Sequence, residues 1–189
     1  MSIPGLMRHI VMLDDEIVKP EKSTSAFICY AHQDNEDKNP KLRWVERFLQ
    51  FIRPLTRQEN LKVWSDQELK IGDEWHLKIQ RQLSEAKAIV LFVSPAFLAS
   101  DYIAVHELPI LLMRAKKRGV PILQLIIAPC LDDDTIFKYP DPKFGPYEFS
   151  LRSIQAANAP SKTLIEMDEA AQNRILIEVA KSLKEALSN

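Results

Sequence analysis

Glu107 is the residue of this chain whose type and position most suggest chemistry. It lies in the mostly apolar run FLASDYIAVHELPILL, just after an apolar strand-like segment. A carboxylate there is either a solvated helix residue or a functional group facing a dry cleft. Pro109 lacks an N–H and presses on the carbonyl of Val105. It therefore either kinks the helix beside Glu107 or begins a second helical segment.

Several other chemistries are not indicated. The chain has only four glycines, and no glycine-rich loop follows the first predicted strand, which excludes a dinucleotide fingerprint and a P-loop. No nucleophile elbow surrounds Ser94, so a serine hydrolase is not expected. The four histidines lack metal-ligand spacing, and we expect no metal site. Cys29 and Cys130 are interpreted as buried thiols in a reducing cytoplasm.

The bulk composition is that of one globular domain. The chain has 189 residues, 46% hydrophobic and 27% charged. Its net charge of −1 gives no reason to expect nucleic acid or an anionic membrane as a partner. The apolar runs are too short to span a bilayer, and the N-terminus does not have the pattern of a signal peptide. We expect an arm or linker over residues 1–25, a domain over 26–189 and a cytoplasmic location.

Apolar runs alternate with helical patterns along the domain. Near-continuous apolar strands are predicted at 26–30, 61–64, 88–94 and 120–127, as in a parallel sheet covered on both faces. Residues 131–148 are predicted to be an irregular loop, with a short final strand near 149–154. Ser100 or Asp101 is expected to cap the helix that carries Glu107. The apolar helical stripes contain Val45, Phe48, Leu49, Ile52 and Leu55, then Trp75, Ile79, Leu83 and Ala86, then Ala171, Ile175, Val179 and Leu183.

In an open α/β sheet, ligands bind beyond the carboxyl ends of the strands. Aromatic side chains there, at Tyr30 and Trp64, either stack on a ligand or pack in the core. Asp66 either binds a ribose hydroxyl or caps the following loop. Ser94 either touches substrate or stabilises the Ser-Pro turn. Candidate binding residues at these ends, and on the helix of Glu107, are Tyr30, Ala31, His32, Trp64, Asp66, Ser94, Tyr102 and Ile103.

Three segments resemble the sequence boxes of a bacterial Toll/interleukin-1 receptor (TIR) domain. They are FICYAHQD, VWSDQELKIGDEWHLKI and AIVLFVSPAFLASDYIAVHEL, in that order along the chain. The resemblance covers roughly residues 24–130. It implies a flavodoxin-like three-layer fold, with a central parallel five-stranded sheet in the order 2-1-3-4-5 flanked by helices.

The resemblance also implies an activity. Enzymatic family members cleave NAD at the nicotinamide–ribose bond, with the glutamate that matches Glu107 as catalytic residue, so NAD is a substrate and no cofactor is implied. Many active members carry a tryptophan four residues before this glutamate, where this chain has Ile103. Tyr102 is the candidate replacement for that aromatic face.

A single carboxylate is chemically sufficient for this reaction. Nicotinamide in NAD is already cationic at its ring nitrogen and leaves as a neutral molecule, so no general acid is needed. The remaining task is to stabilise the positive charge that grows on the ribose anomeric carbon. A fixed carboxylate in a water-poor site does this, and its removal costs about 3 kcal/mol or more of transition-state stabilisation.

Two functions remain open at this stage, and a receiver-type phosphorelay domain is weaker because FICYAH lacks an acidic pair. The first is an NAD glycohydrolase or cyclase acting in bacterial antiviral or stress signalling. The second is a non-catalytic TIR scaffold. In both, the resemblance implies a "BB" loop at about 66–74 that contacts other TIR domains, with a sensor domain or protein as a further partner. Its residues Leu69, Ile71 and Gly72 either dock on another TIR domain or fold back onto the chain's own core.

Overall fold

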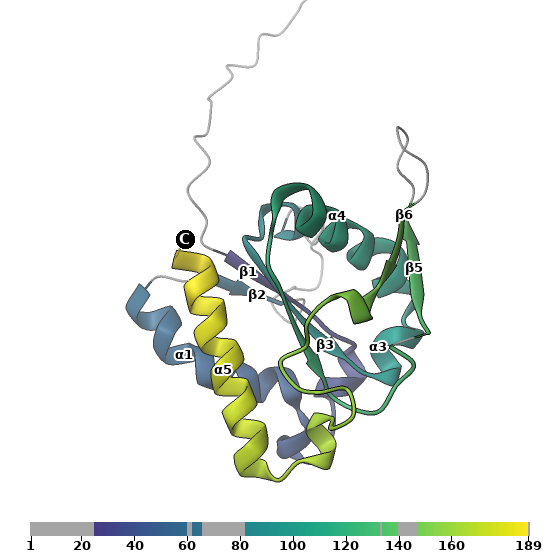
Figure 1. Cartoon of the computed structure of the whole chain (residues 1–189). Coiled ribbons are helices and arrows are strands. Elements are labelled where there is room, and N and C mark those ends of the chain that lie inside the picture. The colour runs from purple at the N-terminus through teal and green to yellow at the C-terminus, as the bar shows by residue number, and fades with distance from the viewer. Residues whose placement is uncertain (1–24, 60–61, 66–81, 133, 140–146, 189) are drawn as a thin grey trace, which may run out of the picture.

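The centre of the structure is a parallel sheet of four strands in the order β2-β1-β3-β4 (Figure 1). The structure is a computed structural model and describes residues 25–59, 62–65, 82–132, 134–139 and 147–188. The strands are β1 (Ser25–Cys29), β2 (Lys62–Trp64), β3 (Ala88–Val93) and β4 (Ile122–Ile126). This confirms the predicted parallel α/β fold and the first four positions of the predicted strand order.

The inner strands are apolar because both faces of the sheet are covered. Every residue of β1 and of β3 is buried, as the runs SAFIC and AIVLFV predict. Successive side chains point to opposite faces, so each strand contributes to two apolar clusters, one on each side of the sheet. Cys29 pairs in register with Leu91 and Val93 with Ile126, so the strands end close together at their carboxyl ends.

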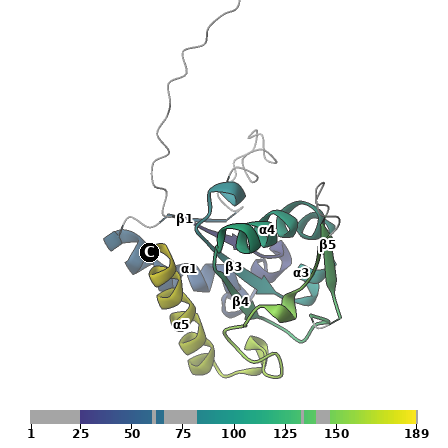
Figure 2. The ribbon, with the colours of Figure 1, turned by 45° about the horizontal axis from the view of Figure 1, so that its top comes forward.

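Helices cover the two faces. On one face lie α1 (Trp44–Glu59) and α5 (Glu169–Ser188), and on the other lie α3 (Pro95–Ala99) and α4 (Leu108–Arg118) (Figure 1). The turned view shows the sheet between α4 and α5 (Figure 2). Short 3-10 turns are η1 (His32–Asn35), η2 (Pro40–Leu42), η5 (Leu151–Ser153) and η6 (Leu164–Glu166).

The helix ends follow the expected chemistry. The Asp168 carboxylate accepts a hydrogen bond from the Ala171 N–H at 2.8 Å, and it lies at the positive end of the α5 dipole, which favours a carboxylate. At the other end of a helix, Gly119 closes α4 with φ of 66°, a left-handed conformation that favours glycine. The predicted stripe of α1 is confirmed at Val45, Phe48 and Ile52, which are all buried.

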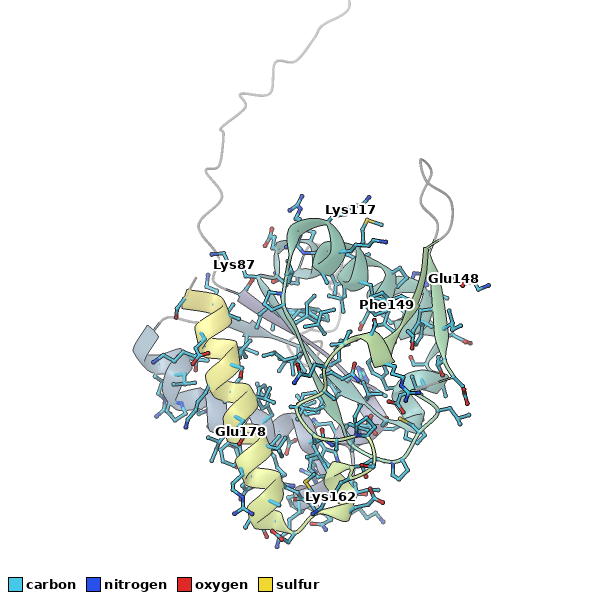
Figure 3. The ribbon with its side chains drawn as sticks, viewed as in Figure 1. Lys87, Lys117, Glu148, Phe149, Lys162 and Glu178 are labelled. Carbon is cyan, nitrogen blue, oxygen red and sulfur yellow. The ribbon has the colours of Figure 1, made fainter. Side chains whose placement is uncertain are left out.

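The prediction of an irregular loop at 131–148 is wrong in part. Strands β5 (Ile136–Tyr139) and β6 (Tyr147–Ser150) form a separate antiparallel pair. On β6, exposed Glu148 pairs with Lys138 at 2.9 Å, whereas neighbouring Phe149 packs on the cluster under α4 (Figure 3). The alternation of exposed and buried side chains extends over only four residues in each strand, which is too short to be recognised within an Asp- and Pro-rich segment.

The expected fifth strand of the main sheet is also corrected. In place of a strand, the part of the chain that the structure describes makes one parallel bridge to β4, at Gln124 and Ala156. Beyond it, the side-chain amide of Asn158 replaces backbone pairing. It accepts a hydrogen bond from the Ile126 N–H and donates one to the Ile126 carbonyl, both at 2.9 Å. Small residues with low strand propensity, such as Ala156 and Ala157, explain why no longer strand forms.

Some expectations lie outside the described residues. These are the arm, apart from Ser25, which begins β1, and the part of the predicted 75–86 helix that precedes residue 82. Residues 82–85 are helical, and both Leu83 and Ala86 are buried as predicted. None of the helices in the described ranges is long and apolar enough to cross a membrane.

Candidate active site

A distorted helix carries Glu107. The helix begins at residue 101. The hydroxyl of the preceding residue, Ser100, accepts a hydrogen bond from the Ile103 N–H at 3.3 Å, which confirms Ser100 as the predicted cap. Residues Ile103–Glu107 then form the π-turn η4, and the Leu108 N–H donates to the Ile103 carbonyl five residues back. Such π-turns are rare in proteins as a whole, and those that occur are frequently at functional sites.

Pro109 accounts for the place of this π-turn. It lies in the first turn of α4, so a second helical segment does begin there, as one of the two interpretations of Pro109 required. Its ring clashes with the carbonyl four residues back in a regular α-helix, and the wider π-turn relieves that clash. The start of a second helical segment at Pro109 is thus confirmed, whereas a kink stays a prediction. The distortion ends at Glu107, the residue that the sequence singled out.

The Glu107 carboxylate is buried. Its residue is 5% exposed, and the Cys29 thiol donates a hydrogen bond to Glu107 Oε2 at 2.9 Å. Cys29 is the last residue of β1 and is 1% exposed. A buried charge requires hydrogen-bonding partners, and this contact places one oxygen of Glu107 at the carboxyl end of the central strand. The site therefore has a buried acid at the carboxyl ends of the strands, where ligands bind in open α/β sheets.

The structure brings three of the predicted binding residues to the same face as Glu107. Ala31, Trp64 and Ile103 belong to the buried cluster on the α3/α4 side, as does Cys29. The Trp64 ring stacks on Phe27, with centroids 5.2 Å apart and an interplanar angle of 25°. Trp64 thus packs in the core, one of the two roles considered for it, and contact with substrate stays a prediction.

Tyr102 lies at the edge of that cluster. Its side chain is half-buried and packs against the cluster, and its ring centroid is 5.0 Å from that of His106. Ile103, at the position where many active family members carry tryptophan, is 3% exposed. Tyr102 therefore remains the aromatic side chain nearest in sequence that could contact a ligand beside Glu107.

Tyr30 lies on the opposite face. It is buried in the cluster under α1 and α5, and its ring stacks on exposed His32 with centroids 5.7 Å apart. The alternation of side chains along β1 explains this, because Cys29 and Ala31 point to the Glu107 side. The Tyr30 ring therefore packs with the α1/α5 cluster and with His32, on the face opposite to Cys29 and Ala31.

Ser94 joins the ends of β1 and β3. Its hydroxyl donates a hydrogen bond to Asp34 Oδ2 at 2.6 Å and accepts one from the Phe97 N–H at 3.0 Å. Ser94 therefore caps α3, which agrees with the turn-stabilising role considered for it. Burial raises the pKa of Asp34, and the hydrogen bond from Ser94 partly offsets this effect. The pair lies where the strand order reverses, between β1 and β3.

The remaining predicted residues lie outside the described part of the chain. These are Asp66 and the assembly-loop residues Leu69, Ile71 and Gly72. In the part that the structure describes, no three histidine, cysteine, aspartate or glutamate side chains are grouped so as to hold a metal ion.

Sequence reasoning missed two residues of this site. Cys29 was interpreted only as a buried thiol, although strand alternation puts it on the same face as Ala31. Asp34 follows the first strand within the segment FICYAHQD, at the end of the sheet where ligand sites form. Both residues could have been found because they lie at, or within a few residues of, the carboxyl end of the first strand.

A four-stranded parallel sheet covered by helices, with polar side chains at its carboxyl ends, defines a doubly wound α/β protein of the flavodoxin type. The sequence model of the family described as TIR domain matches residues 26–174. The chain belongs to the TIR domain family.

Two curated relatives share part of the sequence. One is the 2' cyclic ADP-D-ribose synthase BtTIR of Bacteroides thetaiotaomicron, 29% identical over 89 residues, which are 47% of this chain and 28% of that protein. The other is protein y4lF of Sinorhizobium fredii (strain NBRC 101917 / NGR234), 24% identical over 162 residues, which are 86% of this chain and 43% of that protein. The chain thus spans less than half the length of both relatives.

A solved structure is also similar. The TIR domains of the activated Roq1 resistosome, which directly recognises the pathogen effector XopQ, align with a TM-score of 0.44 and 12% sequence identity. The alignment covers 85% of this chain and 83% of that one.

Proposed function

We propose that this chain is an NAD-cleaving TIR domain, with Glu107 as its catalytic residue. The observation that carries the proposal is the buried Glu107 carboxylate, held by the Cys29 thiol at the end of β1 and by a π-turn in its own helix. Membership of the TIR family and the partial similarity to a 2' cyclic ADP-D-ribose synthase support it.

The proposed reaction breaks the bond between the anomeric carbon of the ribose and the nicotinamide nitrogen. The bonding electrons neutralise the pyridinium ring, and nicotinamide leaves without being protonated. Positive charge develops on the anomeric carbon, and the Glu107 carboxylate stabilises it in a site that excludes water. Water or a hydroxyl of the same molecule then attacks that carbon, and Glu107 accepts the proton that the attacking group releases. The attacking group decides whether the product is linear or cyclic ADP-ribose.

Release of nicotinamide from NAD by the purified chain tests this function. Glu107→Gln keeps the shape of the side chain and removes its charge, so we expect the rate to fall by about 100-fold or more with the fold intact. Glu178→Gln, on the exposed outer side of α5, is the matched control and should leave the rate unchanged (Figure 3). A Glu107→Gln variant that keeps most of the turnover would show that Glu107 is not the catalytic residue.

Activity is proposed to depend on contacts between TIR domains, in a cytoplasmic effector that acts in bacterial antiviral or stress signalling. One weak loop contact does not offset the entropy lost on association, so the isolated chain should be mostly monomeric and poorly active. Fusion to an oligomerising domain should raise nicotinamide release per molecule, and Gly72→Pro should suppress the rise. A rate strictly proportional to protein concentration, with no response to Gly72→Pro, would indicate a self-contained monomeric site.

A second candidate is a non-catalytic TIR scaffold. The observation that favours it is Ile103, which is buried at the position where many active members have tryptophan and offers no aromatic face. The scaffold predicts self-association without nicotinamide release at any protein concentration. The same measurements therefore decide between the two functions.

A further inference from the structure

The contact between Cys29 and Glu107 joins segments that are 78 residues apart in the sequence. Cys29 is the last residue of the buried strand β1, and its Sγ lies 2.9 Å from Glu107 Oε2. The thiol is a weak donor, and hydrogen bonds to a charged acceptor are shorter than those to a neutral one. A separation of 2.9 Å is within hydrogen-bonding distance, so the thiol is placed to donate to the carboxylate.

We propose that Cys29 is a positioning residue, which holds the Glu107 carboxylate in its reactive orientation and favours its charged form. The inference deepens the proposed function and rests on the catalytic role of Glu107. The thiol itself does not react, because Cys29 is 1% exposed and a buried thiol is inert. It acts by holding Glu107, because Cys29 is fixed in the sheet, where it pairs in register with Leu91 of β3.

Two consequences follow from a donor at this position. A hydrogen bond to the charged form of an acid favours that form, so the carboxylate stays ionised to lower pH than it would without the thiol. The bond also fixes one oxygen, so the other oxygen has a defined direction from which to meet the substrate. Loss of the donor should therefore reduce kcat and weaken activity in acid, with little effect on KM.

The other titratable groups near this end of the sheet have contacts of their own among the described residues. Asp34 of η1 is bonded to Ser94, and His106, on the helix of Glu107, packs against the Tyr102 ring. On β5, which packs against α4, Lys138 pairs with Glu148. The described residues of α3 carry no titratable side chain. Cys29 donates a hydrogen bond directly to Glu107.

The test compares variants that keep or remove the donor. Cys29→Ala should lower kcat by about tenfold and move the acid limb of the pH–activity profile up by about one pH unit. Cys29→Val also lacks a donor but fills the space of the thiol, and it should behave in the same way. Cys29→Ser restores a donor and should recover most of the activity and the wild-type acid limb. Ile89→Val, which removes one methylene from the same face of β3, should lower Tm and leave both unchanged.

A readout that needs no activity separates this inference from the proposed function. In protein labelled with carboxyl-¹³C glutamate, the signal absent from Glu107→Gln reports the titration of Glu107. Its midpoint should rise by about one pH unit in Cys29→Ala and Cys29→Val but not in Cys29→Ser. An unchanged midpoint in the two donor-free variants would overturn the inference. A shifted midpoint in a protein that releases no nicotinamide would support the role of Cys29 and refute the proposed function.

Discussion

The two faces of the sheet bury their polar side chains in different ways. Under α1 and α5, the cluster is apolar, and a buried charged group, Arg47, lies on α1 beside it. The Arg47 guanidinium donates to the Lys41 carbonyl at 2.7 Å, to Gln172 at 2.8 Å and to Asn173 at 2.9 Å. Under α3 and α4, the acid Glu107 is buried and meets a thiol from the sheet.

The difference lies in what each contact does. The bonds of Arg47 tie α1 to α5, and its guanidinium lies 4.9 Å from the centre of the Trp44 ring, so the group fastens two regular helices together. Glu107 ends a distorted helical turn, where a regular α-helix with an apolar side chain would serve stability better. A buried polar group that joins regular elements indicates stability, and one on a distorted element indicates function.

The largest expected effect is on the α1/α5 face. Phe48 is fully buried, and its ring meets Phe92 edge-on with centroids 5.7 Å apart. Phe48→Ala should lower the free energy of unfolding by about 3–5 kcal/mol, seen as a fall in Tm of about 10 °C. Ile177→Ala, at an exposed position of α5, should cost far less. A marked loss of kcat in the folded part of the Phe48→Ala protein would show that this face also takes part in the chemistry.

Arg47 tests whether the polar group of that face is purely structural. Arg47→Met keeps the length of the side chain and leaves the Lys41 carbonyl, Gln172 and Asn173 without these donors. We expect a loss of about 2 kcal/mol of stability, and a fall in Tm of about 5 °C, with nicotinamide release unchanged. Arg47→Lys keeps the charge but cannot form all of these hydrogen bonds at once, so its Tm should lie between that of Arg47→Met and that of the wild type. A fall in kcat without a fall in Tm would contradict the assignment.

Pro109 tests whether the distortion of the other face is functional. Pro109→Ala restores an N–H and removes the ring that favours the π-turn, so the helix can become regular. A π-turn holds one more residue than a turn of regular α-helix, and each helical residue turns the chain by about 100°. If the π-turn becomes a regular turn, the Glu107 side chain therefore changes its direction relative to α4. We expect kcat to fall by about tenfold or more, with Tm unchanged or higher. Pro95→Ala, at the first position of α3, is the matched control and should keep kcat.

Asp34 gives the smallest effect. Burial raises its pKa, so the folded state favours the protonated carboxyl, and ionisation at neutral pH opposes folding. This penalty is present above the unfolded value of about 3.8 and disappears below it, where both states are protonated. Asp34→Asn should therefore raise Tm by about 2 °C at pH 7 and by nothing at pH 3. The exposed Asp134→Asn should change Tm at neither pH; an equal gain at both values of pH for Asp34→Asn would refute burial as the cause.

Local signals made the inner layers of the fold predictable. The runs AFICY and AIVLFVS are apolar throughout because both faces of β1 and β3 are covered, and the stripe of α1 follows from its helical spacing. The capping of the Glu107 helix by Ser100 was also predictable, because it depends on neighbours in the sequence.

The contacts that complete the site depend on distant residues. Cys29 meets Glu107 across 78 positions, and Ser94 meets Asp34 across 60. Strand alternation alone could have separated Tyr30 from Cys29 and Ala31, but only packing shows that Trp64 stacks on Phe27. The π-turn depends on whether the helix relieves the clash at Pro109 by bending or by widening, and tertiary packing decides between these.

The amide of Asn158 has a consequence for how the protein behaves in a crowded solution. An unpaired sheet edge is a template on which another chain can add a strand, the first step of aggregation. On β4, the Ala156 bridge and the Asn158 side chain occupy the groups of Gln124 and Ile126 that would receive such a strand. One backbone bridge and one side chain thus cover this part of the edge without a fifth strand, and they leave these groups of β4 unable to pair with a strand of another chain.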